Sequence, residues 1–76
     1  MTEFQNIGLV LRSERLKADK TMEESAQRCD KSFQWLSDIE RGRRRITFAD
    51  ALTLLEFYQS DLTVVQREIN TLNKYK

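Results

Sequence analysis

The stretch Thr21-Met-Glu-Glu-Ser-Ala-Gln-Arg-Cys-Asp-Lys-Ser-Phe-Gln-Trp-Leu-Ser-Asp-Ile-Glu-Arg-Gly42, followed directly by Arg43-Arg44-Arg45, decides the fold of this chain. Thr21 and Glu24 have the spacing of a capping box, in which the threonine hydroxyl accepts from the backbone at Glu24 and the glutamate carboxylate reaches back. This pattern predicts a helix from Thr21 to about Cys29. The remainder of the stretch predicts a second helix close behind the first, and then a basic loop.

The second helix of the stretch is predicted from Phe33 to Arg41. Asp30-Lys31 forms the turn before it, because aspartate tolerates left-handed backbone better than most residues. Ser32 is expected to cap this helix, and Gly42 is expected to end it in the left-handed conformation. Two short helices that cross at a steep angle across such a turn can place the second one in a DNA major groove.

Helical spacing of apolar residues extends over the rest of the chain. With no proline and only two glycines, the chain is predicted to be all-α. One helix is expected over about residues 2–18, a fourth behind a cap at Thr47, and a fifth behind a cap at Ser60 or Asp61. We therefore predict one compact five-helix domain over residues 1–76, with the helix pair at about 21–42 and C-terminal helices at about 47–72. The apolar faces are expected to contain Ile7, Val10, Leu11 and Leu16 in the first helix, Phe48, Ala51, Leu52, Leu55 and Tyr58 in the fourth, and Leu62, Val65, Ile69 and Leu72 in the fifth.

Size and composition exclude several classes of protein. A chain of 76 residues makes one small domain whose stability must come from helix packing. The single cysteine, Cys29, excludes an internal disulfide and fits a reduced cytoplasmic compartment, and the absence of histidine removes the usual metal-ligand sets. No long apolar run or leader pattern is present, so neither membrane insertion nor export is expected. No nucleophile–base set or phosphate loop is present either, so no enzyme activity, metal, cofactor or small-molecule ligand is expected.

The basic residues are concentrated in one part of the chain. The formal charge of the whole chain is only +1, but residues 12–45 contain ten basic and seven acidic residues. Residues 46–76 contain three basic and four acidic residues. A chain that is near neutral overall and locally basic can bind phosphates through one face, although many solvated helical surfaces have the same pattern.

The sequence resembles the lambda-repressor-like, Cro-type helix-turn-helix regulators, also called XRE-type regulators. The resemblance extends from Ile7 to about Tyr58. It rests on three motifs, which are Ile7-Gly-x-x-Leu-Arg-x-x-Arg15, Thr21-x-Glu-Glu-x-Ala26 and Leu36-Ser-x-Ile-Glu-Arg-Gly42. The third motif is the most specific of the three. It is typical of the family when it follows a small residue of the preceding helix, here Ala26, at the distance found in this sequence.

The resemblance implies how the helices pack. Ala26 would let the third helix cross closely over the second, and Leu36 and Ile39 would anchor the third helix from beneath. An ion pair is implied between Arg15 and Glu40, which would fix the orientation of the helices more than it adds stability. The alternative is that both are ordinary surface charges.

Three positions depart from the family pattern. Ser25 stands where a leucine usually packs between the helices, and Lys20 stands where an apolar residue is common. Met22 or a dimer contact is expected to fill the resulting gap. Asp30 replaces the turn glycine at little cost, because aspartate is tolerated in that conformation.

The resemblance assigns the outer face of the third helix to base recognition, at Phe33, Gln34 and Asp38, with Trp35 near the groove wall. The amide of Gln34 can pair with adenine in two-pronged fashion. Asp38 could accept from a cytosine amino group, or instead repel phosphate and disfavour misregistered binding. Phe33 could pack on thymine methyl groups and Trp35 on sugar and methyl groups. The alternative for both aromatic residues is a place in the core or in a protein interface.

Phosphate contacts are expected from the basic loop and from the helix ends. The beginning of the helix at Thr21 offers unpaired N–H groups and a partial positive charge to a phosphate. With Leu36 and Ile39 facing inward, helix periodicity places Ser37 and Arg41 at least partly outside. The alternative for the run of arginines at 43–45 is a solvated loop with no role in binding. The residues expected to contact phosphates are Thr21, Met22, Lys31, Ser37, Arg41, Arg43, Arg44 and Arg45, with Arg12 as an additional candidate.

A dimer is expected because one domain of this size contacts too few base pairs for useful selectivity. Members of the family that the chain resembles typically dimerise and bind two half-sites about one helical turn apart. Apolar residues after Phe48 exceed what a second core layer needs, which predicts an interface between two copies. The alternative is that they close the core of the monomer. The residues expected in the dimer interface are Phe57, Tyr58, Leu62, Val65 and Ile69.

The sequence therefore predicts a homodimeric, sequence-specific transcription regulator that binds double-stranded operator DNA and regulates its own gene. In length and layout it resembles phage Cro-like repressors and restriction–modification controller proteins, of bacterial or phage origin and associated with the nucleoid. Such a regulator would block RNA polymerase or, from an upstream site, contact it. The alternative function is a protein-interaction module, such as an antirepressor or an antitoxin, in which Phe33 and Trp35 grip a protein.

Overall fold

The computed structural model of the protein describes residues 3–60, 63 and 67, with side chains from Asn6 onward within this set. The helices are α1 (Glu3–Lys17), α2 (Met22–Arg28), α3 (Phe33–Glu40) and α4 (Phe48–Phe57). No strand occurs among the described residues, so the predicted all-α class is confirmed. The predicted fifth helix lies almost entirely outside the described residues and stays a prediction.

Local sequence explains where three of the helices begin. Thr21 Oγ1 accepts from the backbone N–H of Glu24 at 3.0 Å, and the backbone N–H of Thr21 donates to the Glu24 carboxylate at 3.1 Å. This is the predicted capping box, and it starts α2. The hydroxyls of Ser32 and Thr47 cap α3 and α4 in the same way, each accepting from the backbone three residues later.

Left-handed residues separate the helices. Asp30 has φ of 56° in the turn between α2 and α3, as predicted, and Gly42 has φ of 75° after α3. Asp19 after α1 and Gln59 after α4 take the same conformation, with φ of 58° each, and neither was predicted from the sequence. Each of the four helices is therefore followed by one left-handed residue that turns the chain.

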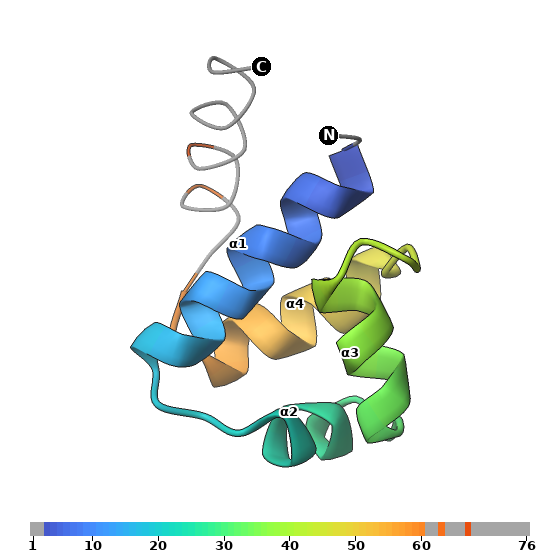
Figure 1. Cartoon of the computed structure of the whole chain (residues 1–76). Coiled ribbons are helices and arrows are strands. Elements are labelled where there is room, and N and C mark those ends of the chain that lie inside the picture. The colour runs from blue at the N-terminus through green and yellow to red at the C-terminus, as the bar shows by residue number, and fades with distance from the viewer. Residues whose placement is uncertain (1–2, 61–62, 64–66, 68–76) are drawn as a thin grey trace.

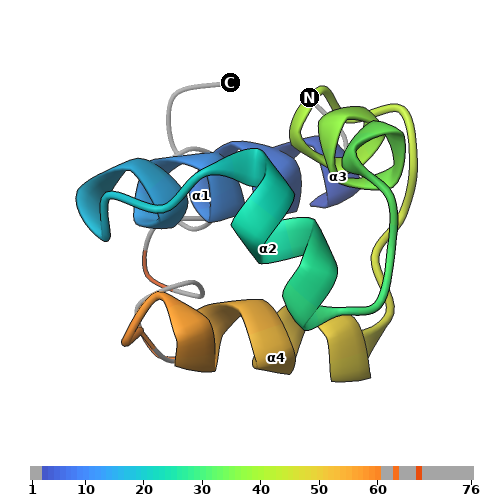
Figure 2. The same cartoon turned by 90° about the horizontal axis from the view of Figure 1, so that it is seen from below.

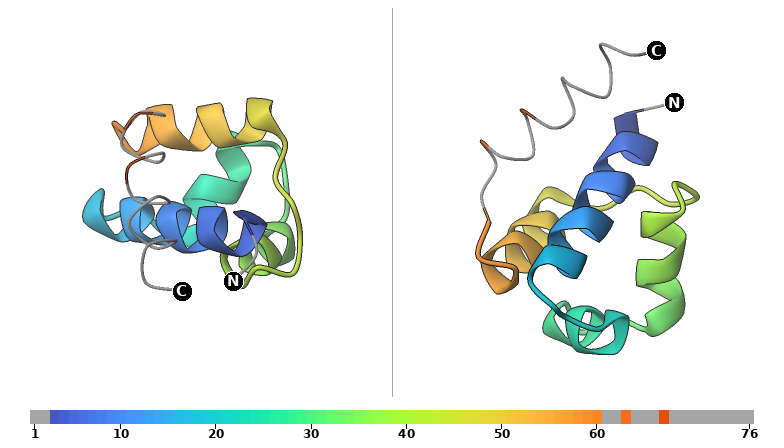
Figure 3. Two further views of the ribbon diagram at one scale, coloured as in Figure 1. Left: turned by 90° about the horizontal axis from the view of Figure 1, so that it is seen from above. Right: turned by 60° about the vertical axis from the view of Figure 1, so that its left-hand side comes forward.

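The helices enclose a common core and leave α2 and α3 on one side of the molecule. Figure 1 shows α2 and α3 meeting at a steep angle across the short turn between them. Seen from below, α1 and α4 lie on opposite sides, and α2 runs across between them (Figure 2). The views in Figure 3 show the same arrangement from above and from the side, with α3 next to one end of α1. Contacts of α3 with both α1 and α2 hold it in this place.

The core contains side chains from all four helices. Leu11 of α1, Ala26 of α2, Leu36 and Ile39 of α3, and Leu54 of α4 are almost completely buried. The inward anchoring predicted for Leu36 and Ile39, and the close packing predicted at Ala26, are therefore present.

Two apolar residues predicted for the core are instead exposed. Leu16 is 58% exposed, because it follows Leu11 by five residues and so lies on a different face of α1. Phe48 is 65% exposed, since it is the first residue of α4 and precedes the buried part of that helix at Leu54 and Leu55. None of the helices within the described part of the chain is both long and apolar enough to cross a membrane.

The gap expected at the unusual Ser25 is filled within the monomer. Ser25 is fully buried, and its hydroxyl donates to the Thr21 carbonyl at 2.8 Å, which satisfies the buried polar group. Met22 packs against the core cluster, as predicted, and Tyr58 is buried in that cluster with only 5% exposure. Burial raises the pKa of Tyr58 to about 12.

Candidate nucleic-acid interface

The outer face of α3 presents an exposed aromatic ring and a coupled polar pair. Phe33, the first residue after the Ser32 cap, is 47% exposed. Gln34 is exposed one residue later, and its Nε2 donates to Asp38 Oδ1 at 2.9 Å. The two polar residues predicted to contact bases therefore form one hydrogen-bonded unit along the helix.

The other two α3 residues assigned to DNA in the sequence analysis are less accessible. Trp35 is half-buried and packs against the core cluster, so at least part of its ring has the structural role that was the alternative prediction. Ser37 is only 4% exposed, so the prediction that it points outward is wrong. Phe33, Ser37 and Arg41 are spaced four residues apart and form one row along α3, and this row faces the space toward α1.

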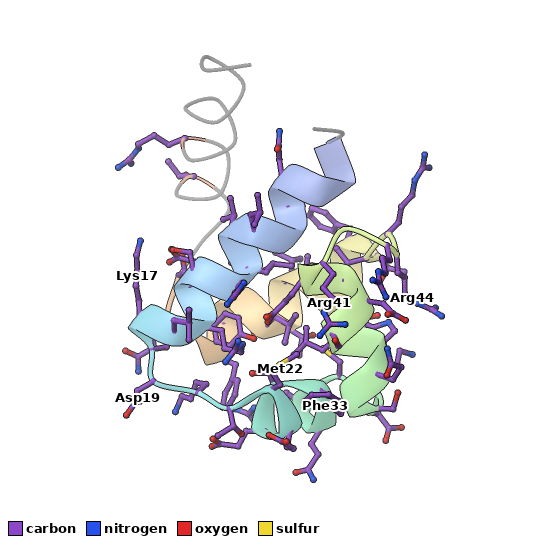
Figure 4. All side chains as sticks on the ribbon, in the orientation of Figure 1. Lys17, Asp19, Met22, Phe33, Arg41 and Arg44 are labelled. Carbon is purple, nitrogen blue, oxygen red and sulfur yellow. The ribbon has the colours of Figure 1, made fainter. Side chains whose placement is uncertain are left out.

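A hollow of about 190 Å³ lies between α1, α2 and α3. In Figure 4 the labelled side chains of Met22, Phe33 and Arg41 lie around the space that these three helices enclose in that view. Arg12 and Arg41 are exposed at its sides, and no ion pair or hydrogen bond of either guanidinium is seen among the described residues. The hollow is lined by Arg12, Arg15, Met22, Phe33, Ser37, Glu40 and Arg41.

The ion pair expected between Arg15 and Glu40 is present at the inner side of the hollow. Arg15 Nε donates to Glu40 Oε2 at 2.8 Å, and Nη2 donates to Oε1 at 3.1 Å. Nη1 donates to the Lys20 carbonyl at 3.0 Å, so each nitrogen of the guanidinium has a partner. The hydrogen bonds with Glu40 raise the pKa of Arg15 above its ordinary value, and both side chains are mostly buried. The pair fixes α1 against the end of α3.

The beginning of α2 is less suited to a phosphate than the sequence suggested. The backbone N–H of Thr21 is already donated to Glu24, and the threonine hydroxyl accepts from the backbone at Glu24. Hydrogen bonds from Thr21 lower the pKa of the Glu24 carboxyl, so a negative charge is held at this helix end. This end of α2 can still offer the hydroxyl hydrogen of Thr21 and the backbone N–H groups of Met22 and Glu23.

The basic loop after α3 is anchored by its backbone, and its arginine side chains are exposed. The backbone N–H of Gly42 donates to the Ile39 carbonyl at 3.0 Å, and that of Arg43 donates to the Asp38 carbonyl at 2.8 Å. These two bonds are the Schellman pattern that ends a helix with a left-handed glycine. Arg43, Arg44 and Arg45 are exposed directly after it, and Lys31 is exposed in the turn before α3. Basic side chains therefore flank both ends of the α3 face.

The residues predicted to form a dimer interface divide into three cases. Tyr58 is buried in the monomer core, so the prediction that it contacts a second copy is wrong. Phe57 is half-buried, and the cations of Lys20 and Arg28 lie over its ring at 4.8 and 4.7 Å from the centroid. The ring of Phe57 therefore already makes two cation–π contacts within the monomer. Leu62, Val65 and Ile69 lie outside the described residues.

Two residues have a larger part in the structure than the sequence predicted. Gly8 lies so close to the Ile39 carbonyl oxygen that a β-carbon at position 8 would clash with it. Arg12 was only an additional candidate, yet it lines the hollow beside α3. Both residues lie in the motif from Ile7 to Arg15, which was the available signal. No group of acidic, cysteine or histidine residues suited to a metal ion occurs in the part of the chain that the structure describes.

A capped α2, a left-handed turn and an α3 that crosses over α2 define a helix-turn-helix domain. The chain belongs to the helix-turn-helix domain family, whose model matches residues 6–67. Among solved structures, the crystal structure of the clp gene regulator ClgR from C. glutamicum matches with a TM-score of 0.85 and 24% sequence identity, over 93% of this chain and 91% of that one. At this identity the likeness shows a shared fold. No curated protein matches the sequence significantly. The predicted resemblance to helix-turn-helix regulators is confirmed.

Proposed function

We propose that the protein is a sequence-specific DNA-binding transcription regulator that inserts α3 into the major groove of operator DNA. The observation that carries the proposal is the placement of α3 between the basic turn at Lys31 and the arginine loop at 43–45. Its face presents the exposed Phe33 and Gln34 and the half-buried Asp38. Basic side chains at both ends of a recognition helix can neutralise the phosphates that border the groove. Membership of the helix-turn-helix family and the shared fold with a gene regulator support the same conclusion.

Base selection in this proposal rests mainly on the Gln34–Asp38 unit, with Phe33 packing on thymine methyl groups. Trp35 contributes with the exposed part of its ring. Backbone contacts come from Lys31, Arg41 and the loop arginines, assisted by Thr21 and Met22 at the beginning of α2. Ser37 is not included among the phosphate contacts of the outer face of α3, because it is buried.

The regulator acts as a homodimer on two half-sites, and it represses its own gene in the manner of a phage repressor or a restriction–modification controller. The physical reason for a dimer is that one α3 reads only a few base pairs. Of the predicted interface, Leu62, Val65 and Ile69 remain candidates, while Tyr58 is excluded by its burial. A monomeric mass at micromolar concentration in sedimentation would refute the dimer without touching the DNA-binding proposal.

DNA binding is tested by selecting ligands for the full chain from a random pool of double-stranded DNA. We expect an enriched motif with two half-sites about 10 base pairs apart, centre to centre. Fluorescence anisotropy against salt concentration then measures the number of phosphates contacted. Arg44→Gln should lower the slope by roughly one unit and weaken binding to all sequences about equally.

Lys17→Gln is the matched control for Arg44→Gln, because it removes one positive charge on the opposite side of the molecule (Figure 4). Its salt slope should stay within error of the original chain. Failure to enrich any motif, together with binding that does not depend on salt, would overturn the proposal. That result would favour the protein-interaction alternative, for which the exposed ring of Phe33 is the supporting observation.

A further inference from the structure

The helix pair α2–α3 exposes one large apolar side chain among the described residues. Phe33 is 47% exposed and is the first residue of α3. The other large apolar residues with such exposure lie in α1 and α4, and they are Leu9, Leu16 and Phe48. A ring on the face that enters the groove loses its water there, so binding is tighter where the DNA offers it an apolar partner.

The position of the Phe33 ring is set by the chain around it. The Ser32 hydroxyl accepts from the backbone N–H of Trp35 at 3.2 Å, which fixes the beginning of α3. Met22, the first residue of α2, lines the same hollow as Phe33 and packs against the core cluster, so it continues the apolar surface toward α2 (Figure 4). Both helices of the pair therefore begin with an apolar side chain at the rim of one hollow.

The edge of a base pair in the major groove offers one apolar group. Its other groups are hydrogen-bond donors and acceptors, and the exception is the methyl group at C5 of thymine. Cytosine that is methylated at C5 carries the same methyl group at the same ring carbon, and ordinary cytosine lacks it. An apolar contact to this methyl group therefore distinguishes 5-methylcytosine from cytosine, as it distinguishes thymine from uracil.

The polar contacts of α3 are separate from this apolar one. Gln34 Nε2 donates to Asp38 Oδ1 at 2.9 Å, and Phe33 takes no part in that pair. The amide of Gln34 recognises donors and acceptors, which methylation at C5 leaves in place. Removal of the methyl group should thus weaken the contact of Phe33 alone.

We propose that Phe33, supported by Met22, is a contact site for the C5-methyl group of a pyrimidine, so that cytosine methylation of the operator strengthens binding. The inference rests on the proposed DNA-binding function and adds a form of regulation to it. The methyl group belongs either to thymine or to 5-methylcytosine, and the two arms of the test separate these sources.

The test measures binding of the full chain to duplexes of its selected operator by fluorescence anisotropy. Each pyrimidine of one half-site is occupied in turn by thymine, uracil, 5-methylcytosine and cytosine, with the matching purine opposite. At one position we expect thymine to bind about 3–5-fold more tightly than uracil, as burial of one methyl group predicts. The same factor should separate 5-methylcytosine from cytosine at that position.

Matched variants assign the methyl effect to the ring. Phe33→Ala should reduce both ratios to less than about 1.5-fold, and Phe33→Leu should keep them at about 2-fold, because it retains apolar surface. Gln34→Ala should weaken binding and leave both ratios unchanged. Phe48→Ala removes an exposed phenyl group outside α3 and is the control, with both ratios as in the original chain. Thermal unfolding of each variant verifies that the fold is kept.

The outcomes separate this inference from the proposed function. Operator binding with equal affinities within each pair of pyrimidines, or with ratios that persist in Phe33→Ala, overturns the methyl contact and leaves the DNA-binding function standing. A preference for thymine over uracil without one for 5-methylcytosine over cytosine overturns the regulation by methylation. Failure to select any operator overturns both.

Discussion

Gly8 of α1 lies against the backbone carbonyl oxygen of Ile39 in α3, with no room for a side-chain carbon between them. The two helices therefore approach backbone to backbone, which few residues other than glycine permit. This contact lies beside the Arg15–Glu40 ion pair, which joins the same two helices. Gly8 thus sets the distance of α3 from α1, and Arg15 sets its orientation.

Gly8→Ala is expected to destabilise the protein by about 2–3 kcal/mol, as overpacking does when backbone must move. In an unconstrained helix the same change would stabilise by about 0.5–1 kcal/mol. Urea unfolding followed by circular dichroism measures the difference. Ser13→Ala, also inside α1, is the control for helix propensity and should be neutral or slightly stabilising. A Gly8→Ala protein as stable as the original would show that α1 and α3 do not touch at this point.

Breaking the Arg15–Glu40 pair from one side should cost about 2–4 kcal/mol, because a mostly buried charge loses its partner. Arg15→Met and Glu40→Leu are the single variants, and urea unfolding is the measurement. The double variant should be more stable than either single one, since it leaves no unpaired charge. Additive losses in the double variant would mean that the two side chains act independently.

The Glu24 carboxyl makes the stability of α2 depend on pH. Its pKa is lower in the folded protein because Thr21 donates to the carboxylate. The stabilisation is therefore complete above the ordinary pKa of 4.5 and is lost as the pH falls through the folded pKa. Glu24→Gln keeps the capping hydrogen bonds and should flatten the decrease in melting temperature below pH 4.5. Glu23→Gln, in the same turn but outside the capping box, is the control, and an equal flattening there would contradict the assignment.

Cys29 should react slowly in the folded protein. Burial is the main reason that its pKa is raised from 9.0 to about 11, and its Sγ lies 3.7 Å from the Asp50 carbonyl oxygen. At pH 8 this rise lowers the thiolate fraction about 100-fold. A thiolate of higher pKa is a stronger nucleophile than one of ordinary pKa, and this recovers about 10-fold of the lost reactivity. Alkylation by iodoacetamide should therefore be at least about 10-fold slower than in urea, where the chain is unfolded. Equal rates in both conditions would place Cys29 on an open surface.

The raised pKa of Cys29 also has a consequence for stability. The folded state holds its thiol proton more tightly than the unfolded chain, so this contribution is complete below about pH 9 and is lost as the pH rises toward 11. The Tyr58 shift from 10.0 to about 12 acts in the next higher range. Cys29→Ser should reduce the loss of melting temperature between pH 9 and 11.

Features of the fold that depend on local chemistry could be predicted from the sequence. Thr21, Ser32 and Thr47 cap helices because a side-chain oxygen meets a backbone N–H three residues later, and this spacing is visible in the sequence. The left-handed Asp30 and Gly42 follow from the same kind of local argument. Features that depend on distant partners could not be predicted, such as the approach of Gly8 to Ile39.

The candidate site was predicted less completely than the fold. Helix periodicity gives the direction of a side chain only relative to its own helix. Ser37 was therefore expected outside, whereas it is only 4% exposed beside residues of α1 and α2. The same limit applies to Tyr58, whose face of α4 is apolar in either a core or an interface. The Gln34–Asp38 hydrogen bond needed side-chain conformations that spacing alone does not provide.

The hydrogen bond between Gln34 and Asp38 should make base selection at these two residues interdependent. Gln34 Nε2 donates to Asp38 Oδ1 at 2.9 Å, which holds the amide in one orientation and leaves its oxygen and second N–H for a base. Asp38→Ala should therefore relax the preference for the base that Gln34 reads, by about 2–5-fold, as well as any preference of its own. Asp38→Asn keeps an acceptor for Gln34 and should preserve that preference. Selected DNA motifs of the original chain and of both variants provide the measurement. If Asp38→Ala changes only one base position, and that position is unaffected by Gln34→Ala, then the two residues contact DNA separately.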